Sequence, residues 1–191
     1  IVASLGFFPN PDGYSFPNYG DGPDSDLTVD DMVYIYGADK VCKTTSPCVL
    51  TAAAEAWRLA WIDLVKGGHC AGMAMSSLLI FDRADLTPAT YQGGANVTYD
   101  LTKANVRRLI ALYATTQMRT PVNRTGLTGN VTAYGASSVL NTLISNFNTS
   151  SPADRYRMGF VKADGTGGHA VTPYAVEQRG ADEYWIYVYD N

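Results

Sequence analysis

The sequence predicts an α+β fold in which helices come first and an antiparallel sheet comes last. Apolar residues recur at helical spacing in several segments between positions 28 and 147. Three later runs are rich in Val, Tyr, Ile and Phe, and turn-forming residues separate them. Helices followed by strands, rather than alternating with them, indicate an α+β layout. The length of 191 residues suits a single domain.

The first 27 residues are rich in Pro, Gly, Asn and Asp, which predicts an irregular segment. Its Phe and Tyr side chains indicate that it lies on the body of the protein. The next stretch, LTVDDMVYIYG, predicts a short helix. Thr28 is suited to cap this helix, and Asp30 and Asp31 fall in its positive first turn. Gly37 is expected to end it.

Cys42 and Cys48 lie six positions apart in the stretch VCKTTSPCVL. A short loop of this kind can close as a disulfide in an oxidising compartment, and we expect that bond here. The alternative is a loop with two unpaired thiols. If the bond forms, Cys70 is the odd cysteine, and such a thiol is either buried and inert or reactive.

Four further helices follow from apolar periodicity. The segment TAAAEAWRLAWIDLVKGG predicts a helix that ends at Gly67 and Gly68. The face expected to be buried carries Ala53, Trp57, Ala60, Trp61 and Leu64. Residues 70–81 are apolar on nearly all sides, so that helix is expected at the centre of the fold. Amphipathic helices are predicted within 101–118 and over 136–147.

The last third of the chain predicts an antiparallel meander of three strands. The strand segments are RYRMGFVKADG, HAVTPYAVEQRG and EYWIYVYDN. Turn residues in ADGTGG and RGADE separate them, so neighbouring strands are expected to pair.

Composition excludes some classes of function. The net charge of −4 provides no basic face, so nucleic acid is not an expected partner. No apolar run approaches the roughly 18 residues that a membrane span requires. No cofactor or metal is expected. The predicted disulfide and four Asn-x-Ser/Thr triplets favour a secreted or cell-surface protein. The chain begins with Ile, so we expect that a preceding segment was removed.

The stretch GGHCAGMAMSSLLIF places Cys70 in the first turn of the central helix, directly after a glycine pair. A helix N-terminus has unpaired N–H groups and a partial positive charge, which favour a thiolate over a thiol. The backbone N–H at this position can also stabilise an oxyanion. The small residues Ala71 and Gly72 are expected to leave room for a substrate. The alternative is a small apolar core residue, a common role for free cysteine.

A thiol nucleophile works best with a base beside it, and the chain contains two histidines. His69 adjoins Cys70 in sequence, so the two side chains are not expected to face each other. His169 is the better candidate because it opens a strand after a second glycine pair. An imidazole base needs a third group that fixes its orientation. Asp190, at the end of the next strand, is preferred for this role over Asn191.

A cysteine that opens a helix, followed by His and Asp on successive strands, resembles the papain-like cysteine peptidase superfamily. The motifs GGHCAGMAMSSL, GGHAVTPYAV and IYVYDN look like those of an uncharacterised group of secreted bacterial and archaeal papain-fold proteins. Wider relatives include bacteriocin-leader peptidases and transglutaminase-like proteins. The resemblance covers residues 67–81 and 165–191. It implies one papain-like domain with Cys70 as nucleophile, His169 as general base and then acid, and Asp190 as the orienting group.

Two features depart from that resemblance. Papain-like enzymes often carry a glutamine about six residues before the nucleophile as an oxyanion donor, and Leu64 occupies that position here. Asn18 in SFPNYG, His69 and Gln92 are the candidate replacements, with Asn18 preferred. The third catalytic residue would also lie at a chain end, where fraying is common. We therefore expect the natural chain to continue beyond Asn191, with further domains as an option.

From these residues we expect a thiol-dependent hydrolase that cleaves a peptide or protein substrate through an acyl-enzyme. Acyl transfer to an amine, as in transglutaminases, would use the same residues. A catalytically disarmed papain-like module for binding or structure is the alternative from another class, and the missing glutamine favours it. A third alternative is zinc binding by His69, Cys70 and His169, although a tetrahedral site requires a fourth ligand.

Overall fold

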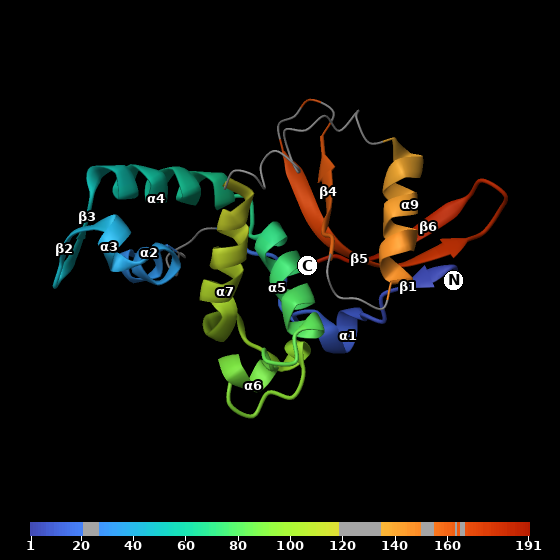
Figure 1. Ribbon diagram of the computed structural model, residues 1–191, viewed down its shortest axis with the longest axis horizontal. Coiled ribbons are helices and arrows are strands. Elements are labelled where there is room, and N and C mark those ends of the chain that lie inside the picture. Colours follow the sequence, from blue (N-terminus) through green and yellow to red (C-terminus); the bar gives the residue numbers. More distant parts are fainter. Residues whose placement is uncertain (21–26, 119–134, 150–154, 163, 165–166) are drawn as a thin grey trace.

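The computed structural model confirms an α+β architecture, with the helices packed on a C-terminal antiparallel sheet (Figure 1). The structure describes residues 1–20, 27–118, 135–149, 155–162, 164 and 167–191. The helices are α1 (Pro9–Asp12), α2 (Val29–Tyr36), α3 (Ala38–Val41), α4 (Ala52–Val65), α5 (Cys70–Asp82), α6 (Pro88–Tyr91), α7 (Lys103–Thr115) and α9 (Ala136–Phe147), with 3-10 turns η1 (Thr98–Asp100) and η2 (Thr116–Met118). The strands are β1 (Ala3–Ser4), β2 (Cys42–Thr45), β3 (Cys48–Leu50), β4 (Met158–Val161), β5 (Gly168–Gln178) and β6 (Tyr184–Tyr189).

The long strand β5 organises the main sheet. The first half of β5 pairs with β4, and this pairing runs from Met158 opposite Val171 to Val161 opposite Gly168. The second half of β5 pairs with β6. The predicted meander of β4, β5 and β6 is therefore confirmed. The short strand β1 also pairs with β5, through Ala3 and Val176. The sequence did not predict β1 because two residues are too few to show the alternation of a strand.

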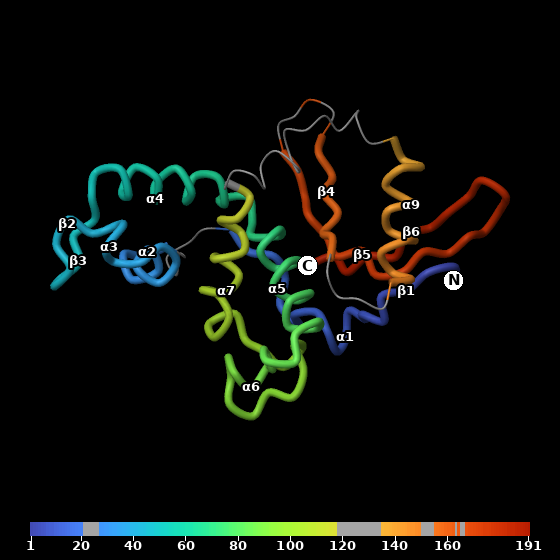
Figure 2. Tube along the Cα trace, in the orientation of Figure 1, coloured from blue at the N-terminus to red at the C-terminus, as the bar shows by residue number. Residues whose placement is uncertain are grey.

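Helices cover both faces of this sheet. On one face, Val176 and Ile186 of the strands pack with Leu143 and Phe147 of α9. On the other face, Tyr174 and Tyr189 pack against α5 and against a residue of the N-terminal segment; the α5 partners are Leu78 and Phe81, and the N-terminal residue is Phe7. Figure 2 shows the tube of α5 between α7 and the sheet. The described part of the N-terminal segment, residues 1–20, therefore packs on the body through Phe7, and residues 21–26 of the predicted segment lie outside the described residues. It is not wholly irregular, because it contains β1 and α1.

The predicted central helix is confirmed, and a glycine explains how closely it packs. Most side chains of α5 are buried, and α7 crosses it with Ile110 next to Gly72. A Cβ atom at Gly72 would lie 2.2 Å from the carbonyl oxygen of Ile110. The expectation that Gly72 leaves room for a substrate is wrong, because the space beside it is filled by the backbone of α7.

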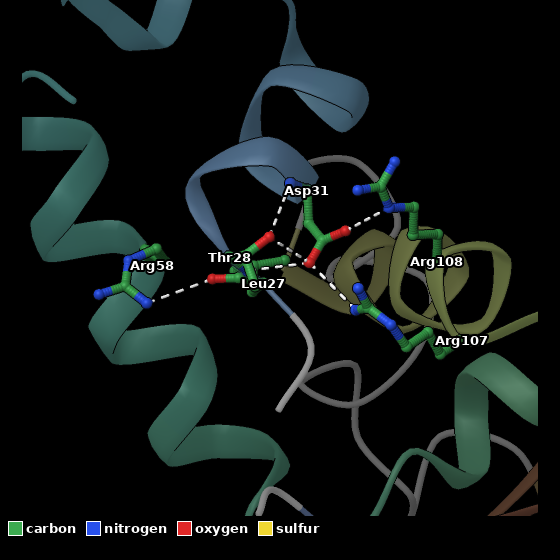
Figure 3. Close-up of polar contacts among 6 residues, drawn as sticks. All are labelled: Leu27, Thr28, Asp31, Arg58, Arg107 and Arg108. Carbon is green, nitrogen blue, oxygen red and sulfur yellow. Dashed lines mark hydrogen bonds and ion pairs between the residues drawn. The ribbon is translucent and has the colours of Figure 1, made fainter. Parts of the chain in front are cut away.

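The predicted helix at LTVDDMVYIYG is confirmed as α2, with its cap. The Thr28 hydroxyl accepts a hydrogen bond from the Asp31 N–H, while the Asp31 carboxylate accepts one from the Thr28 N–H. The same carboxylate is fully buried and forms ion pairs with Arg107 at 3.1 Å and Arg108 at 2.6 Å. Figure 3 shows both arginines extending from α7 toward Asp31. The cluster therefore joins the N-terminal helices to α7.

Replacing Asp31 by asparagine is expected to lower the free energy of unfolding by about 1–2 kcal/mol at pH 7, because two half-exposed arginines lose their shared partner. Burial alone would raise the pKa of Asp31, but hydrogen bonds from Thr28 and Arg107 outweigh it and lower that pKa. The contribution is therefore present above the unfolded pKa of about 3.9 and is lost as pH falls through the lower folded value. Urea unfolding of both proteins between pH 3 and 7 measures this difference.

Asp30→Asn is the matched control, since Asp30 lies in the same first turn but is exposed. It is expected to change stability by less than about 0.5 kcal/mol. Equal unfolding free energies for the two variants at pH 7 would show that the Asp31 cluster adds no stability.

The disulfide prediction is also confirmed, since Cys42 and Cys48 are bonded. The residues between them are not a simple loop, because β2 and β3 pair as a hairpin. In α4 the predicted buried face is only partly right. Trp61 is buried and Trp57 is half-buried, but Leu64 is 56% exposed. The buried positions follow a stripe through Ala54, Trp61 and Val65, which is offset from the one expected.

No single helix in the described part of the chain is long and apolar enough to cross a membrane. The helices α4 and α5 reach the required length and composition only when taken together, across a bend of 92°.

Candidate functional site

The candidate nucleophile Cys70 is the first residue of α5, as predicted, and it is the one free cysteine of the chain. Its side chain is half-buried. The turn that leads to it depends on Gly68, whose φ of +140° favours glycine. A Cβ atom at Gly68 would lie 2.2 Å from Asn18 Nδ2. Gly68 therefore does more than follow α4, because it lets the N-terminal segment approach the turn before the cysteine.

Asn18 packs against this turn. Its Oδ1 accepts a hydrogen bond of 2.8 Å from the His69 N–H. Its Nδ2 donates no hydrogen bond to any residue that the structure describes, and the side chain is half-buried. Of the candidate oxyanion donors, Asn18 is thus held beside the first turn of α5. Gln92 lies elsewhere, since its side chain bonds to Asp100, Thr102 and Asn105 in another loop.

His69 is buried in aromatic packing. Its ring stacks on Tyr19 at a centroid distance of 4.5 Å and lies 5.4 Å from the ring of Trp61. Nδ1 lies 2.8 Å from the carbonyl oxygen of Tyr19, so this nitrogen carries the proton. These contacts connect the N-terminal segment to the start of α5. They give His69 a structural role at the turn.

The structure brings His169 and Asp190 together. His169 lies near the start of β5, and Asp190 directly follows β6. Nε2 of the ring is 2.6 Å from Asp190 Oδ1. A carboxylate that accepts from Nε2–H fixes the tautomer and leaves Nδ1 as the unprotonated nitrogen. The pair therefore has the tautomer that a general base requires.

Asn191 connects this pair to the helix. Its Nδ2 donates to the carbonyl oxygens of Cys70 and Ala170, each at 3.2 Å. The Asn191 side chain thus holds the backbone of Cys70 next to the backbone of Ala170, which follows His169. The neighbouring positions Asp190 and Asn191 have different contacts: the first meets the imidazole, and the second meets the helix.

The thiol and the imidazole are not joined by a hydrogen bond within the described part of the chain. Thr172 of β5 faces α5, because its hydroxyl donates to the carbonyl of Ala74. Side chains alternate along a strand, so the His169 side chain leaves the opposite face. His169 also lies beyond the last pair of β5 with β6, which is Thr172 with Tyr189. The ring is therefore at an edge of β5 that β6 does not cover.

A buried tyrosine pair holds the end of β6 in place, and no pattern in the sequence indicated it. The Tyr189 hydroxyl accepts a hydrogen bond of 2.9 Å from the Tyr14 N–H, and the Tyr14 hydroxyl bonds to Ser76 of α5 at 2.8 Å. Burial raises the pKa of both phenols, that of Tyr189 to about 12. Both therefore stay neutral near pH 7, and they link the N-terminal segment, α5 and the strand that leads to Asp190.

The zinc alternative finds no support in the structure. In the part of the chain that is described, no three His, Cys, Asp or Glu side chains converge on a common point. His69, Cys70 and His169 all belong to that part, and His69 is engaged by Tyr19 instead.

Comparisons with known proteins found no match for this chain. No protein-family model matches the chain, and neither a curated protein nor a solved structure does.

Proposed function

We propose that the protein is a thiol-dependent hydrolase of the papain-like type, in which Cys70 attacks a peptide or amide carbonyl. One observation carries the proposal: the only free thiol begins a buried helix, beside strand ends that bear a bonded His169–Asp190 pair. The Cys42–Cys48 bond supports an extracytoplasmic location for this activity.

The reaction proceeds through a thioester. His169 Nδ1 takes the proton of Cys70, and the sulfur bonds to the substrate carbonyl carbon. The C–N bond then breaks, and the imidazolium gives its proton to the leaving amine. Water attacks the thioester with His169 as base, a carboxylic acid leaves, and the proton returns to the sulfur. Asp190 stabilises the imidazolium in both steps.

Two donors are suited to the oxyanion that forms in each step. The N–H of Cys70 has no partner within α5, because it lies in the first turn. Asn18 Nδ2 is the second donor that we propose, since Asn18 is fixed to the turn through its bond to the His69 N–H. It takes the place of the glutamine expected at the position of Leu64, whose side chain is exposed.

Catalysis requires the ring of His169 to swing around the uncovered edge of β5 toward the sulfur. Catalytic hydrogen bonds are often long in a free enzyme and tighten when substrate binds. The lack of a thiol–imidazole bond among the described residues favours a second candidate function: a disarmed module that binds a partner with the same surface. The two candidates differ in the reactivity of Cys70.

Alkylation of Cys70 by iodoacetamide at pH 6 tests the proposal. Because the other two cysteines are bonded, Cys70 is the only site of reaction. An ordinary thiol is only about 0.3% ionised at this pH, given a pKa of about 8.5. The native protein is expected to react at least 10-fold faster than the same protein unfolded in urea with its disulfide intact. Mass spectrometry of time points gives both rates.

A native rate equal to or below the unfolded rate would favour the disarmed module. A peptide library then gives the reaction class: hydrolysis is expected, and it is lost in Cys70→Ser. Addition of a primary amine separates hydrolysis from acyl transfer, because only a transferase would form the new amide as its main product.

A further inference from the structure

Arg157 differs from every other arginine that the structure describes. The others each form an ion pair with a carboxylate, as Arg155 does with Asp82 at 2.7 Å. The remaining pairs are Arg58–Glu55, Arg83–Asp85, Arg107–Asp31, Arg108–Asp31 and Arg179–Glu177. Arg157 is half-buried and forms neither an ion pair nor a hydrogen bond with a described residue. A half-buried guanidinium without a counter-charge is suited to bind an anion.

The register of the sheet places Arg157 on the face that carries α5. The β4–β5 pairing begins with Met158 opposite Val171, so one step back sets Arg157 opposite Thr172. Directly opposed residues share a face of the sheet. Thr172 faces α5 through its bond to the Ala74 carbonyl. Arg155 lies two residues before Arg157, so it is expected on the same face, and it forms an ion pair with Asp82 of α5.

This face leads to the candidate nucleophile. Asn191 bonds to both Ala170 of β5 and Cys70, so β5 lies against the first turn of α5 at this point. Burial lowers the pKa of Arg157, and an electrostatic interaction with Cys70 acts in the opposite direction. Arg157 stays charged even so, because guanidinium groups do not lose their proton in proteins. A fixed positive charge thus lies on the sheet face that meets the first turn of α5.

We infer that Arg157 is a specificity residue that binds a carboxylate next to the carbon attacked by Cys70. This inference rests on the proposed function and narrows its substrates to acyl groups with a carboxylate near the scissile carbonyl, such as an acidic residue on the acyl side of the bond. A guanidinium binds a carboxylate through two parallel N–H···O bonds, which also orients the acyl group.

Two alkylating agents of the same shape provide the test. Iodoacetate carries a carboxylate where iodoacetamide carries a neutral amide, and both react with the same thiolate. The ratio of their rates therefore cancels the degree of thiol ionisation and reports attraction of the carboxylate alone. In the native protein the iodoacetate-to-iodoacetamide ratio is expected to exceed that of the urea-unfolded protein by about 10-fold. It should fall as salt is added, because salt screens the interaction.

Arg157→Gln is expected to lower the ratio about 10-fold, to the unfolded value, whereas Arg157→Lys retains part of it. Lys162→Gln is the matched control, since it removes an exposed charge from the residue after β4 and should leave the ratio unchanged. A native ratio equal to the unfolded one, or a ratio that survives in Arg157→Gln, would overturn the inference. The iodoacetamide rate alone reports on the proposed function, so the two failures are distinct.

Discussion

Replacing His169 by alanine is expected to lower the rate of hydrolysis by about 10²–10⁴-fold. The same substitution should slow the alkylation of Cys70 by iodoacetamide at pH 6, because in the proposed mechanism the His169 ring takes the proton of the thiol. The structure supplies one part of this mechanism, which is the bond that sets the tautomer of the ring. Asp190 bonds to Nε2 at 2.6 Å and so leaves Nδ1 to accept the proton. Stopped-flow or mass-spectrometric time courses measure the alkylation rate, and they require no identified substrate.

Two further substitutions test separate parts of the site. Asp190→Asn tests control of the His169 tautomer, and Asn191→Ala tests the contact that holds the helix against the strand. An amide at residue 190 can donate to the ring and favour the wrong tautomer, so we expect a large loss of activity with little loss of stability. Asn191→Ala removes the bonds to the Cys70 and Ala170 carbonyls, and it should chiefly loosen the contact between helix and strand.

If His169→Ala reacted with iodoacetamide as fast as the unsubstituted protein, His169 would not be the base.

Gly72→Ala is expected to lower the free energy of unfolding by about 3 kcal/mol. In an isolated helix alanine is more favourable than glycine by up to about 1 kcal/mol, so helix propensity alone predicts the opposite sign. Packing decides the result here. The added Cβ would lie 2.2 Å from the Ile110 carbonyl oxygen and 3.0 Å from the Cβ of Ala114. Backbone atoms cannot move aside as a side chain can, so α5 and α7 must separate.

Gly93→Ala is the control for this experiment. Gly93 has no atom within 4 Å of an added Cβ, and it has no positive φ. Its substitution should change stability by less than about 0.5 kcal/mol. Thermal or urea unfolding of the two variants gives the comparison. A Gly72→Ala protein as stable as Gly93→Ala would mean that the two helices can part without cost, which would contradict this prediction.

Local patterns in the sequence were sufficient for most elements of the fold. Thr28, Asp31 and Gly37 mark the ends of α2 because capping depends on residues a few positions apart. The uniform apolar run of α5 predicted its central place, since such a helix has no face for water. The Cys42–Cys48 bond likewise depends on a short separation along the chain. Each of these signals lies within one segment.

The burial of α4 and the use of Gly72 were not predicted correctly, because both depend on a distant partner. Which stripe of α4 is buried is decided by how that helix lies on the rest of the core, and Leu64 is exposed as a result. Gly72 is small because α7 passes beside it, and nothing in residues 67–81 encodes the position of Ile110.

In the candidate site, the residue types and their order could be read from the sequence: one odd cysteine at a helix start, then a histidine and an acid on successive strands. Which of these residues meet could not be read from the sequence, because their contacts depend on how distant segments pack. The packing of strands and helices joins His169 to Asp190 and ties Asn191 to Cys70. The physical reason is that strand register sets the face on which a side chain lies, and a shift of one residue would reverse it.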